Sequence, residues 1–480
     1  MRSLLLSIAL LTPVLAAPTQ DDFYQREEIP LPKGEVMEIG SIALMPDKKV
    51  AVTTRRGDLW ICEGAYEKDL SKVKWTLAHR GLHEPLGMFY KNGSFYLTQR
   101  PEVSKLTDSN GNGKIDSFET ICSDWGINGD YHEYAFGSTP DKEGNVWVVL
   151  CLTGSFHARS PWRGWCMRIT PEGKMIPSCS GVRSPGGIGF NAKGDTFYTD
   201  NQGVWNGSSS LKWLKPGSFQ GNPTGNIFYK DQTEIKPLKN QPNDNSRIEI
   251  ERKRIPQFIP PAVVLPHGKV GQSPTAVIHD QTAGKFGPFP KQVFVGEQTH
   301  SEVQRVYLEK VKGIYQGAVF KCLSGFRAGI IPMRLSDDGT LFVGGSNRGW
   351  GSKGGNPFTF ERVRWNKKTP FEILEMKAKP NGFELTFTEP VDPKTVIPAS
   401  FSMKAWTYIY RSKYGSPEVD PATPVIKSAK VSSDGKSVQL IIDGLVKGHV
   451  HHLHSPGVRS KNNSELWHKD AYYTLNEIPD

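Results

Sequence analysis

The sequence has 480 residues, a mass of 53.4 kDa and a formal net charge of +10 at neutral pH. A chain of this length can bury a large hydrophobic core and favours two domains. Its 48 glycines and 35 prolines, with recurrent aromatic residues, are typical of many short strands joined by turns. The positive charge favours anionic partners in general, but no nucleic-acid-binding motif occurs, and we expect no nucleic-acid partner.

Residues 1–17 have the features of a secretory signal peptide. A single arginine, Arg2, precedes an apolar run over residues 4–11, and the segment ends on the small residues Ala16 and Ala17. The apolar run is too short to span a bilayer, and no later stretch is a candidate for a membrane span. We therefore expect a periplasmic or secreted protein without a membrane span.

A weak repeat occupies the next part of the chain. Each unit has a turn with Asp or Asn close to Gly, or a similar turn, followed by a strand of aromatic and β-branched residues; the units are 45–62, 89–100, 140–150, 191–201, 289–298 and 336–346. Six such units predict an all-β fold, a six-bladed β-propeller over residues 18–368. Insertions are expected between blades, the longest around 215–270. A large array of β-sandwiches is the alternative.

The character of the sequence changes after Trp365. Strands with a two-residue period, such as those at 383–388 and 437–443, predict a separate small β-sandwich of immunoglobulin-like or fibronectin-like size over residues 369–480. We expect this module to dock or stabilise rather than to catalyse. Four histidines of one strand would divide two and two between its faces, as surface residues or as a metal pair: His449, His451, His452 and His454.

The segment from Asp108 to Glu119 fits the twelve-residue calcium loop of EF-hands at every key position. The expected ligands are Asp108, Asn110, Asn112, the carbonyl of Lys114, Asp116 and Glu119, with Gly113 at the sharp turn. Two neutral amides among them predict a weak site. The flanking residues resemble strands, so we expect a structural Ca²⁺ clip rather than a sensor; a plain Asn/Gly turn is the alternative.

Six cysteines remain after the signal peptide: Cys62, Cys122, Cys151, Cys166, Cys179 and Cys322. An exported protein can form disulfides. Cys166 and Cys179 flank the turn at residues 169–177 almost symmetrically, so we expect them to face each other across a hairpin and to form a disulfide. No CxxCH motif for a covalent haem is present.

His132 lies in the sequence YHEYAFG, shortly after the calcium loop. An isolated histidine in such a segment is more often a packed core residue than a base, although its pKa suits proton transfer. Trp205 and Trp350 are candidates for stacking platforms for a sugar, or for packing at the ends of blades.

Several segments resemble the soluble quinoprotein glucose/sorbosone dehydrogenase family, whose members are six-bladed propellers that use pyrroloquinoline quinone (PQQ). They are His132 followed by Gly137 and Pro140-Asp141, the run from Arg183 to Gly187, TFYTDNQG at 196–203, and His83 to Gly87. Nearly the whole mature chain also resembles the planctomycete/verrucomicrobial-type "membrane-bound dehydrogenase" group, through phrases such as LTDSNGNGKID and NRGWGSKGG.

The resemblance implies PQQ and Ca²⁺ as cofactors and assigns roles to individual residues. His132 would be the general base for a sugar hydroxyl, and Arg183 would bind a carboxylate or the developing oxyanion of the quinone. The carbonyls of Gly203 and Val204 would bind a second calcium ion. Arg305, Arg327 and Arg334 would hold the remaining carboxylates. The sequence departs from the family at Ser184, where the family has Asn.

The function that we expect is PQQ-dependent oxidation of a small sugar or glycan, with electrons passed to an external acceptor such as a cytochrome or a quinone. One alternative is a non-catalytic carbohydrate-binding or scaffold propeller. Another is a calcium-dependent glycan hydrolase or lyase that uses His132 and Glu133.

Overall fold

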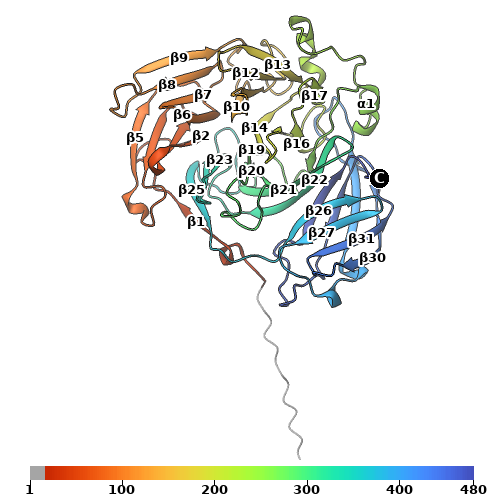
Figure 1. The fold of residues 1–480 in the computed structure, drawn as a ribbon. Coiled ribbons are helices and arrows are strands. Elements are labelled where there is room, and N and C mark those ends of the chain that lie inside the picture. The colour runs from red at the N-terminus through yellow and green to blue at the C-terminus, as the bar shows by residue number, and fades with distance from the viewer. Residues whose placement is uncertain (1–16) are drawn as a thin grey trace, which may run out of the picture.

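The computed structural model describes residues 17–480, so the expected signal peptide lies outside it except for Ala17. Strands dominate this part of the chain (Figure 1). The α-helix is α1 (Ile248–Arg254), and 3-10 helices occupy Gln20–Asp22, Pro46–Lys48, Leu70–Lys72, Pro223–Asp231, Pro393–Thr395 and Pro398–Ser400. None of the helices described is long and apolar enough to cross a membrane.

In the described chain, the strands between residues 24 and 365 form six successive sheets. The first contains β2 (Ile39–Leu44), β3 (Val50–Thr54), β4 (Leu59–Glu63) and β5 (Lys74–His79), and the second contains β6 (Gly87–Lys91), β7 (Ser94–Thr98), β8 (Val103–Thr107) and β9 (Ser117–Cys122). The third contains β10 (Ala135–Pro140), β11 (Val146–Leu150), β12 (Trp165–Ile169), β13 (Met175–Ser180) and β17 (Ser218–Phe219).

The fourth sheet contains β14 (Pro185–Phe190), β15 (Thr196–Asp200), β16 (Ser209–Trp213) and β18 (Val263–Leu265). The fifth begins with β19 (Pro274–His279), β20 (Val293–Glu297), β21 (Glu302–Val311) and β22 (Ile314–Leu323). The sixth contains β23 (Ile330–Leu335), β24 (Leu341–Ser346), β25 (Phe358–Trp365) and the N-terminal strand β1 (Tyr24–Glu28).

The first strands of these sheets contact one another in a closed circle. β2 contacts β6, β6 contacts β10, and the circle continues through β14, β19 and β23 back to β2 (Figure 1). The strands approach closely, since a Cβ atom on Gly87 of β6 would lie 2.6 Å from the carbonyl oxygen of Gly137 in β10. Hydrophobic clusters fill the spaces between neighbouring sheets. The arrangement is propeller-like, as the repeats predict.

The N-terminal strand completes the last sheet of this circle. β1 pairs antiparallel with β25, and Tyr24 lies opposite Trp365. Two ion pairs support the junction, because the carboxylate of Glu27 lies 3.0 Å from the guanidinium of Arg362 and 2.7 Å from that of Arg364. The two ends of the ring are therefore joined by both backbone and side-chain contacts.

The longest insertion lies within a sheet rather than between two sheets. Residues 214–262 separate β16 from β18, which pair with each other as the outer strands of the fourth sheet. The insertion includes β17, which pairs in parallel with β13 of the third sheet, and the helix α1. It therefore bridges two neighbouring sheets at their outer edges.

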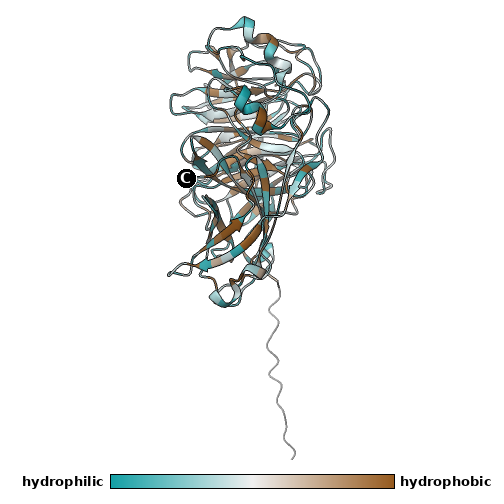
Figure 2. Cartoon of the chain, turned by 90° about the vertical axis from the view of Figure 1, so that its right-hand side faces the viewer, coloured by the Kyte–Doolittle hydropathy of each residue, from teal (hydrophilic) through white to brown (hydrophobic). Residues whose placement is uncertain are grey.

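Residues beyond the ring add two layers of strands. One layer contains β26 (Ile373–Lys379), β27 (Gly382–Phe387), β31 (Ser437–Asp443) and β30 (Val425–Val431), and the other contains β33 (Asp470–Leu475), β32 (His449–His454), β28 (Ser402–Tyr408) and β29 (Glu418–Ala422). A single hydrophobic cluster unites them and includes Phe383, Leu440, Leu453 and Tyr473. Figure 2 shows hydrophobic residues along the strands of this region.

The second of these layers continues the fifth sheet of the ring. β33 pairs antiparallel with β22, with Ala318 opposite Tyr473 and Val319 opposite Tyr472. The fifth sheet thereby reaches eight strands, from β19 to β29. The ring and the C-terminal region, which the sequence predicts as separate domains, therefore share one continuous sheet.

Arg305 fixes the start of the C-terminal region to the fifth sheet. Its guanidinium lies between the rings of Phe289 and Phe320, 4.2 Å from each ring centre. It donates hydrogen bonds of 2.7 and 3.0 Å to the carbonyl oxygens of Ile373 and Leu374. Arg305 is a buried cation whose donors are used within the protein.

We predict that Arg305→Leu lowers the free energy of unfolding by about 3–5 kcal/mol, the range typical when one partner of a buried ion pair is removed. The carboxylate of Glu372, 4.0 Å from the guanidinium, would lose this cation and keep the hydrogen bond of 2.5 Å with His468. Arg327→Ala is the matched control, because its exposed side chain should contribute less than about 0.5 kcal/mol. Unfolding in guanidinium chloride, followed by tryptophan fluorescence, measures both; equal losses would contradict the assignment.

Candidate active site

A cavity of about 410 Å³ lies where the first strands of the sheets begin. The segments before β10 and β14 provide His132, Tyr134 and Arg183, and the segment after β24 provides Trp350. Further lining residues come from all six sheets and the segments that connect their strands. They include Arg55, Leu86, Phe156, Gln202, His267, Thr275, Gln298 and Ile331. The ring therefore brings residues that are distant in sequence to one concave surface.

The charged side chains that line this cavity are of one sign. The described lining contains the cations Arg55 and Arg183 but no aspartate or glutamate. Aromatic rings make up much of the remaining surface. Such a lining favours a ligand that combines negative charge with an apolar face.

His132 is half-buried at the wall of the cavity. Its backbone N–H donates a 2.8 Å hydrogen bond to the carboxylate of Asp130, whose Oδ1 lies 3.9 Å from the imidazole Nδ1. Burial lowers the pKa of His132; Asp130 opposes this effect, and the cations Arg183 and Arg100 add to it. The imidazole is therefore neutral at pH 7 and able to accept a proton.

Arg183 is a buried cation without a carboxylate partner. Its Nη1 donates to the carbonyl oxygens of Asn201 and Gln202 at 3.2 and 2.7 Å. Within residues 17–480, its Nε has no hydrogen-bond partner, and no acidic side chain lies within ion-pair distance. A guanidinium placed in this way favours the entry of an anionic group into the cavity.

The carbonyl groups of Gly203 and Val204 are already hydrogen-bonded. The Gly203 oxygen accepts from the backbone N–H groups of Asn206 and Gly415 at 3.2 and 3.0 Å. The Val204 oxygen accepts from the side-chain amide of Asn222 at 3.2 Å. Positive N–H dipoles thus point at both oxygens, and this donor set does not fit a calcium ion.

The loop between β28 and β29 reaches the cavity from the C-terminal region. Gly415 and Ser416 donate backbone hydrogen bonds to the segment at 203–207, and Tyr414 forms a β-bridge with Val204. The Tyr414 ring lies 5.1 Å from the Arg183 guanidinium. Sequence reasoning missed Tyr414, because it assigned this region to a separate module.

Arg55 was also missed, although it lies deep in the cavity wall. Its guanidinium donates hydrogen bonds of 2.9 and 2.6 Å to Glu84 and one of 3.2 Å to the hydroxyl of Tyr134. Arg100 lies on the other side of Glu84, at 3.5 Å, and its guanidinium also lies over the Tyr134 ring. Arg55, Glu84 and Arg100 thus hold the aromatic ring of Tyr134 in place at the cavity wall beside His132.

The remaining arginine candidates lie outside the main cavity. Arg305 is at the junction described above, and Arg327 is exposed. Arg334 lines a second, smaller cavity of about 40 Å³ between the inner strands, where burial lowers its pKa to about 10. Of the sequence-derived cofactor arginines, the structure brings only Arg183 to His132 among the described residues.

Trp350 and Trp205 have different environments. Trp350 is exposed at the cavity, with its ring 6.1 Å from that of His132. Trp205 packs against Tyr410 at 4.9 Å instead and does not line the cavity. Trp350 is therefore the better placed of the two for stacking on a ligand.

Glu133 points away from the cavity. It is fully buried, and its carboxylate accepts hydrogen bonds from Thr153, Ser160 and the backbone of Asn128. A buried carboxylate with these partners anchors the segment that carries His132. The structure therefore gives no support to a hydrolase or lyase that uses Glu133 beside His132.

The calcium-loop segment connects the two strands of the β8–β9 hairpin. Asp108 accepts from the backbone N–H groups of Asn112 and Gly113, and Asp116 accepts from Ser109 and Asn110. The twelfth residue, Glu119, lies on β9 with its carboxylate 3.3 Å from the ammonium group of Lys105. Closing a calcium shell would require Glu119 to leave this partner.

Cys166 and Cys179 lie directly opposite each other on β12 and β13, as the symmetric turn predicts. No disulfide joins them, however, and all six described cysteines are free and buried. Cys179 instead donates a hydrogen bond to the carbonyl oxygen of Lys215 at 3.2 Å. Burial raises the pKa of both thiols, which makes them poor nucleophiles.

No family model and no curated protein matches this sequence. Solved structures do resemble it. The PQQ-bound aldose sugar dehydrogenase of Streptomyces coelicolor aligns over 72% of this chain and 98% of its own, with 12% identity and a TM-score of 0.51. A Thermus thermophilus protein described as an oxidoreductase (glucose dehydrogenase) aligns over 71% and 99%, with 18% identity and a TM-score of 0.50.

The calcium structure of a Trichoderma reesei protein of carbohydrate-active enzyme family AA12 aligns over 74% of this chain and 98% of its own, with 11% identity and a TM-score of 0.50. At these identities the likeness is one of fold. These proteins are covered almost completely, whereas more than a quarter of this chain has no counterpart in them.

We predict that the imidazole of His132 titrates below pH 6.5 in the folded protein, because burial and the cations Arg183 and Arg100 disfavour its protonated form. The stability that the neutral imidazole of His132 contributes is therefore fully present above the pKa that this histidine has in the unfolded chain. It is lost as the pH falls through its lower pKa in the folded protein. Arg183→Gln should raise the pKa of His132 and Asp130→Asn should lower it further. NMR of histidine-labelled protein measures both shifts.

His132→Gln identifies the resonance in this experiment, and Arg327→Ala is the control that should leave the pKa of His132 unchanged. A His132 pKa above 6.5, or one that does not respond to Arg183→Gln, would contradict the electrostatic description of the cavity.

Proposed function

We propose that this protein is an exported PQQ-dependent sugar dehydrogenase of the soluble glucose/sorbosone type. The observation that carries the proposal is the pairing, in one carboxylate-free cavity, of a neutral histidine with a buried cation that lacks an acidic partner. The similar structures include sugar dehydrogenases, which supports the same chemistry.

The six sheets are, in this proposal, the blades of a six-bladed propeller over residues 18–368. Residues 369–480 form a β-sandwich that is joined to the fifth blade through β33. This module has a functional part, because its loop places Tyr414 at the cavity. The planctomycete/verrucomicrobial-type group remains the proposed relationship for the whole chain.

The lining residues fit a flat, polycarboxylate quinone. Arg183 would bind one carboxylate, and the exposed rings of Tyr414, Phe156 and Trp350 would cover its faces. The cavity volume of about 410 Å³ is that of a small-molecule site. When bound, PQQ supplies a two-electron acceptor for hydride from the sugar.

His132 has the properties needed for the proton transfer. Its imidazole is neutral at pH 7, and it lies at the cavity wall between Trp350 and Tyr134. It accepts the proton of the sugar hydroxyl as the carbonyl forms. The positive field of Arg183 stabilises negative charge that develops beside it. The electrons leave to an external acceptor such as a cytochrome or a quinone.

A calcium ion at Gly203 and Val204 is not part of the proposed mechanism, because both carbonyls are occupied by donors of the chain. This observation favours a second candidate function: a carbohydrate-binding propeller that does not use the quinone. Such a protein would bind sugar on the same aromatic surface without turnover.

Reconstitution of the mature protein with PQQ and Ca²⁺ tests the proposal. We expect quinone binding, seen as a spectral shift, and dye reduction over a panel of sugars. His132→Ala should lower kcat by about 10²–10⁴-fold, the usual contribution of a general base, while quinone binding is retained. Arg183→Gln should weaken quinone binding.

Arg327→Ala, outside the cavity, is the control for both effects. Absence of a spectral shift and of turnover would exclude the dehydrogenase and leave the binding propeller. Full activity of His132→Ala would show that another group is the base.

We also propose a structural calcium ion in the loop from Asp108 to Glu119. Calcium at a hundred times its dissociation constant would add about 2.7 kcal/mol of stability. Glu119→Gln should abolish most of the calcium-dependent rise in melting temperature, because it removes a charged bidentate ligand. Asp434→Asn, in a turn with comparable backbone hydrogen bonds, is the control. An unchanged rise in Glu119→Gln would exclude the site.

A further inference from the structure

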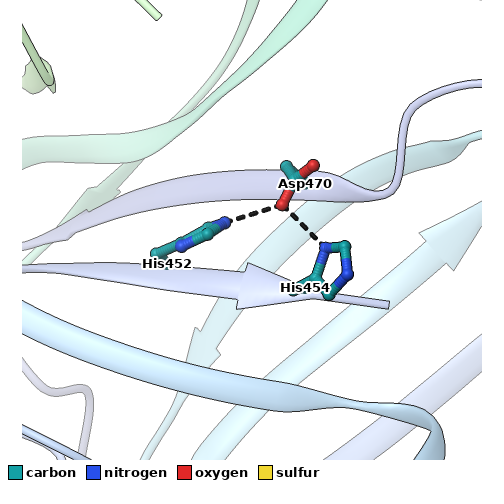
Figure 3. Close-up of side chains that lie close together, drawn as sticks. All are labelled: His452, His454 and Asp470. Carbon is teal, nitrogen blue, oxygen red and sulfur yellow. Dashed lines mark hydrogen bonds and ion pairs between the residues drawn. The ribbon is translucent and has the colours of Figure 1, made fainter. Parts of the chain in front are cut away.

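Two histidines and an aspartate converge on the sheet that extends the fifth sheet of the ring. His454 of β32 lies directly opposite Asp470 of β33, and His452, two residues earlier, occupies the same face (Figure 3). The Oδ1 atom of Asp470 lies 2.7 Å from Nε2 of His452 and 2.8 Å from Nδ1 of His454.

The arrangement was not expected from the sequence, which shows the four histidines without an acidic neighbour. His451 points to the opposite face, where it is buried beside Phe383. The histidines on the two faces therefore have separate environments. Cross-strand register is what supplies Asp470 to His452 and His454.

Asp470 has no other charged partner. Within the described residues, no lysine or arginine lies within ion-pair distance of it, and the neighbouring Lys469 pairs with Glu465 instead. Both histidine nitrogens meet the same carboxylate oxygen, and Oδ2 accepts no hydrogen bond in this part of the chain. The carboxylate therefore keeps an oxygen available for a further interaction.

The three ligand atoms are close enough to share one ion. The two ring nitrogens and the carboxylate oxygen all lie within 4.8 Å of one another, and in the described chain they form the only such group of three or more His, Cys, Asp or Glu side chains. Two imidazoles and one carboxylate are a ligand set that Zn²⁺ uses in open sites.

Neighbouring aromatic residues hold one of the ligands in place. The His452 ring is stacked on Tyr472, with ring centres 4.3 Å apart and planes 7° from parallel. The Trp406 ring meets its edge at 6.3 Å. A ligand held by packing loses little freedom on metal binding, which favours affinity.

We infer that His452, His454 and Asp470 form a binding site for a divalent transition metal, Zn²⁺ in the first place, with three protein ligands and a fourth position open to water. The site is distinct from the cavity, which none of these residues lines. It also differs from the proposed calcium loop, whose ligands are all oxygen atoms, because nitrogen ligands disfavour Ca²⁺.

The geometry keeps the site accessible. The side chains of His454 and Asp470 are 42% and 43% exposed, and that of His452 is 23% exposed. A small shift of the carboxylate away from the two ring nitrogens would admit an ion between the three ligands. The exposed Lys404 lies opposite His452 on the neighbouring strand β28, and its positive charge lowers the affinity for a cation.

Isothermal titration of the chelator-treated mature protein with ZnCl₂, in excess Ca²⁺, tests the inference. We expect one Zn²⁺ per chain. His454→Gln and Asp470→Asn should each weaken Zn²⁺ binding by more than about 100-fold. Loss of a residue that only hydrogen-bonds to a metal ligand weakens binding by at most about 100-fold. His449→Gln, on the same strand, is the matched control and should bind Zn²⁺ as the unchanged protein does. Titration with Co²⁺ should give visible absorption bands that these two ligand variants lose.

Melting temperatures without metal show whether the variants fold. The inference is overturned if Zn²⁺ does not bind at micromolar concentration, or if all variants bind it equally. A lower melting temperature of Asp470→Asn without any Zn²⁺ binding to the unchanged protein would likewise overturn it and identify the cluster as a hydrogen-bonded link between strands. None of these outcomes depends on sugar oxidation.

Discussion

The backbone pairing of β22 with β33 is the constraint on which the functional surfaces of this protein depend. It extends one sheet of the ring into the C-terminal region and fixes the orientation of the strands that pair beyond it. Side chains alternate between the faces of a strand, so this register decides which residues face the ring and which face solvent. The buried contacts of Arg305 at Ile373 and Leu374 reinforce the same junction.

That pairing also positions a loop of the C-terminal region. The loop between β28 and β29 lies against the ring of sheets. There the backbone N–H of Gly415 donates a hydrogen bond to the carbonyl oxygen of Gly203, and the aromatic ring of Tyr414 packs on Arg183. A buried guanidinium without an acidic partner is costly, and here carbonyl oxygens and aromatic faces offset part of that cost. The positive charge of Arg183 that these contacts leave uncompensated favours the binding of an anion in the cavity.

The sequence predicted those features that depend on local pattern. The repeated turn-and-strand units indicated the sheets of the ring, and the symmetric turn placed Cys166 opposite Cys179. His132 and Arg183 were brought together by the resemblance to the quinoprotein family rather than by a local pattern, and both line the cavity. Features that depend on pairing between distant strands were not predictable. Tyr414 and the meeting of Asp470 with two histidines both require the register of β33, which no local pattern encodes. Arg305 and Arg183 look alike in sequence, and only packing distinguishes a junction residue from a cavity residue.

The pairing of β1 with β25 has a consequence for how the chain reaches this structure during synthesis. β1 is the first strand to be made, and its partner is made after all the other strands of the ring. Until then, both edges of the unfinished ring expose unpaired backbone groups, and closure requires contact between residues far apart in the chain. The sixth sheet therefore cannot be completed until the strand that ends at Trp365 has been made. A chain that must stay unfolded during transport across a membrane would gain from this delay, since the contact that completes its structure forms late.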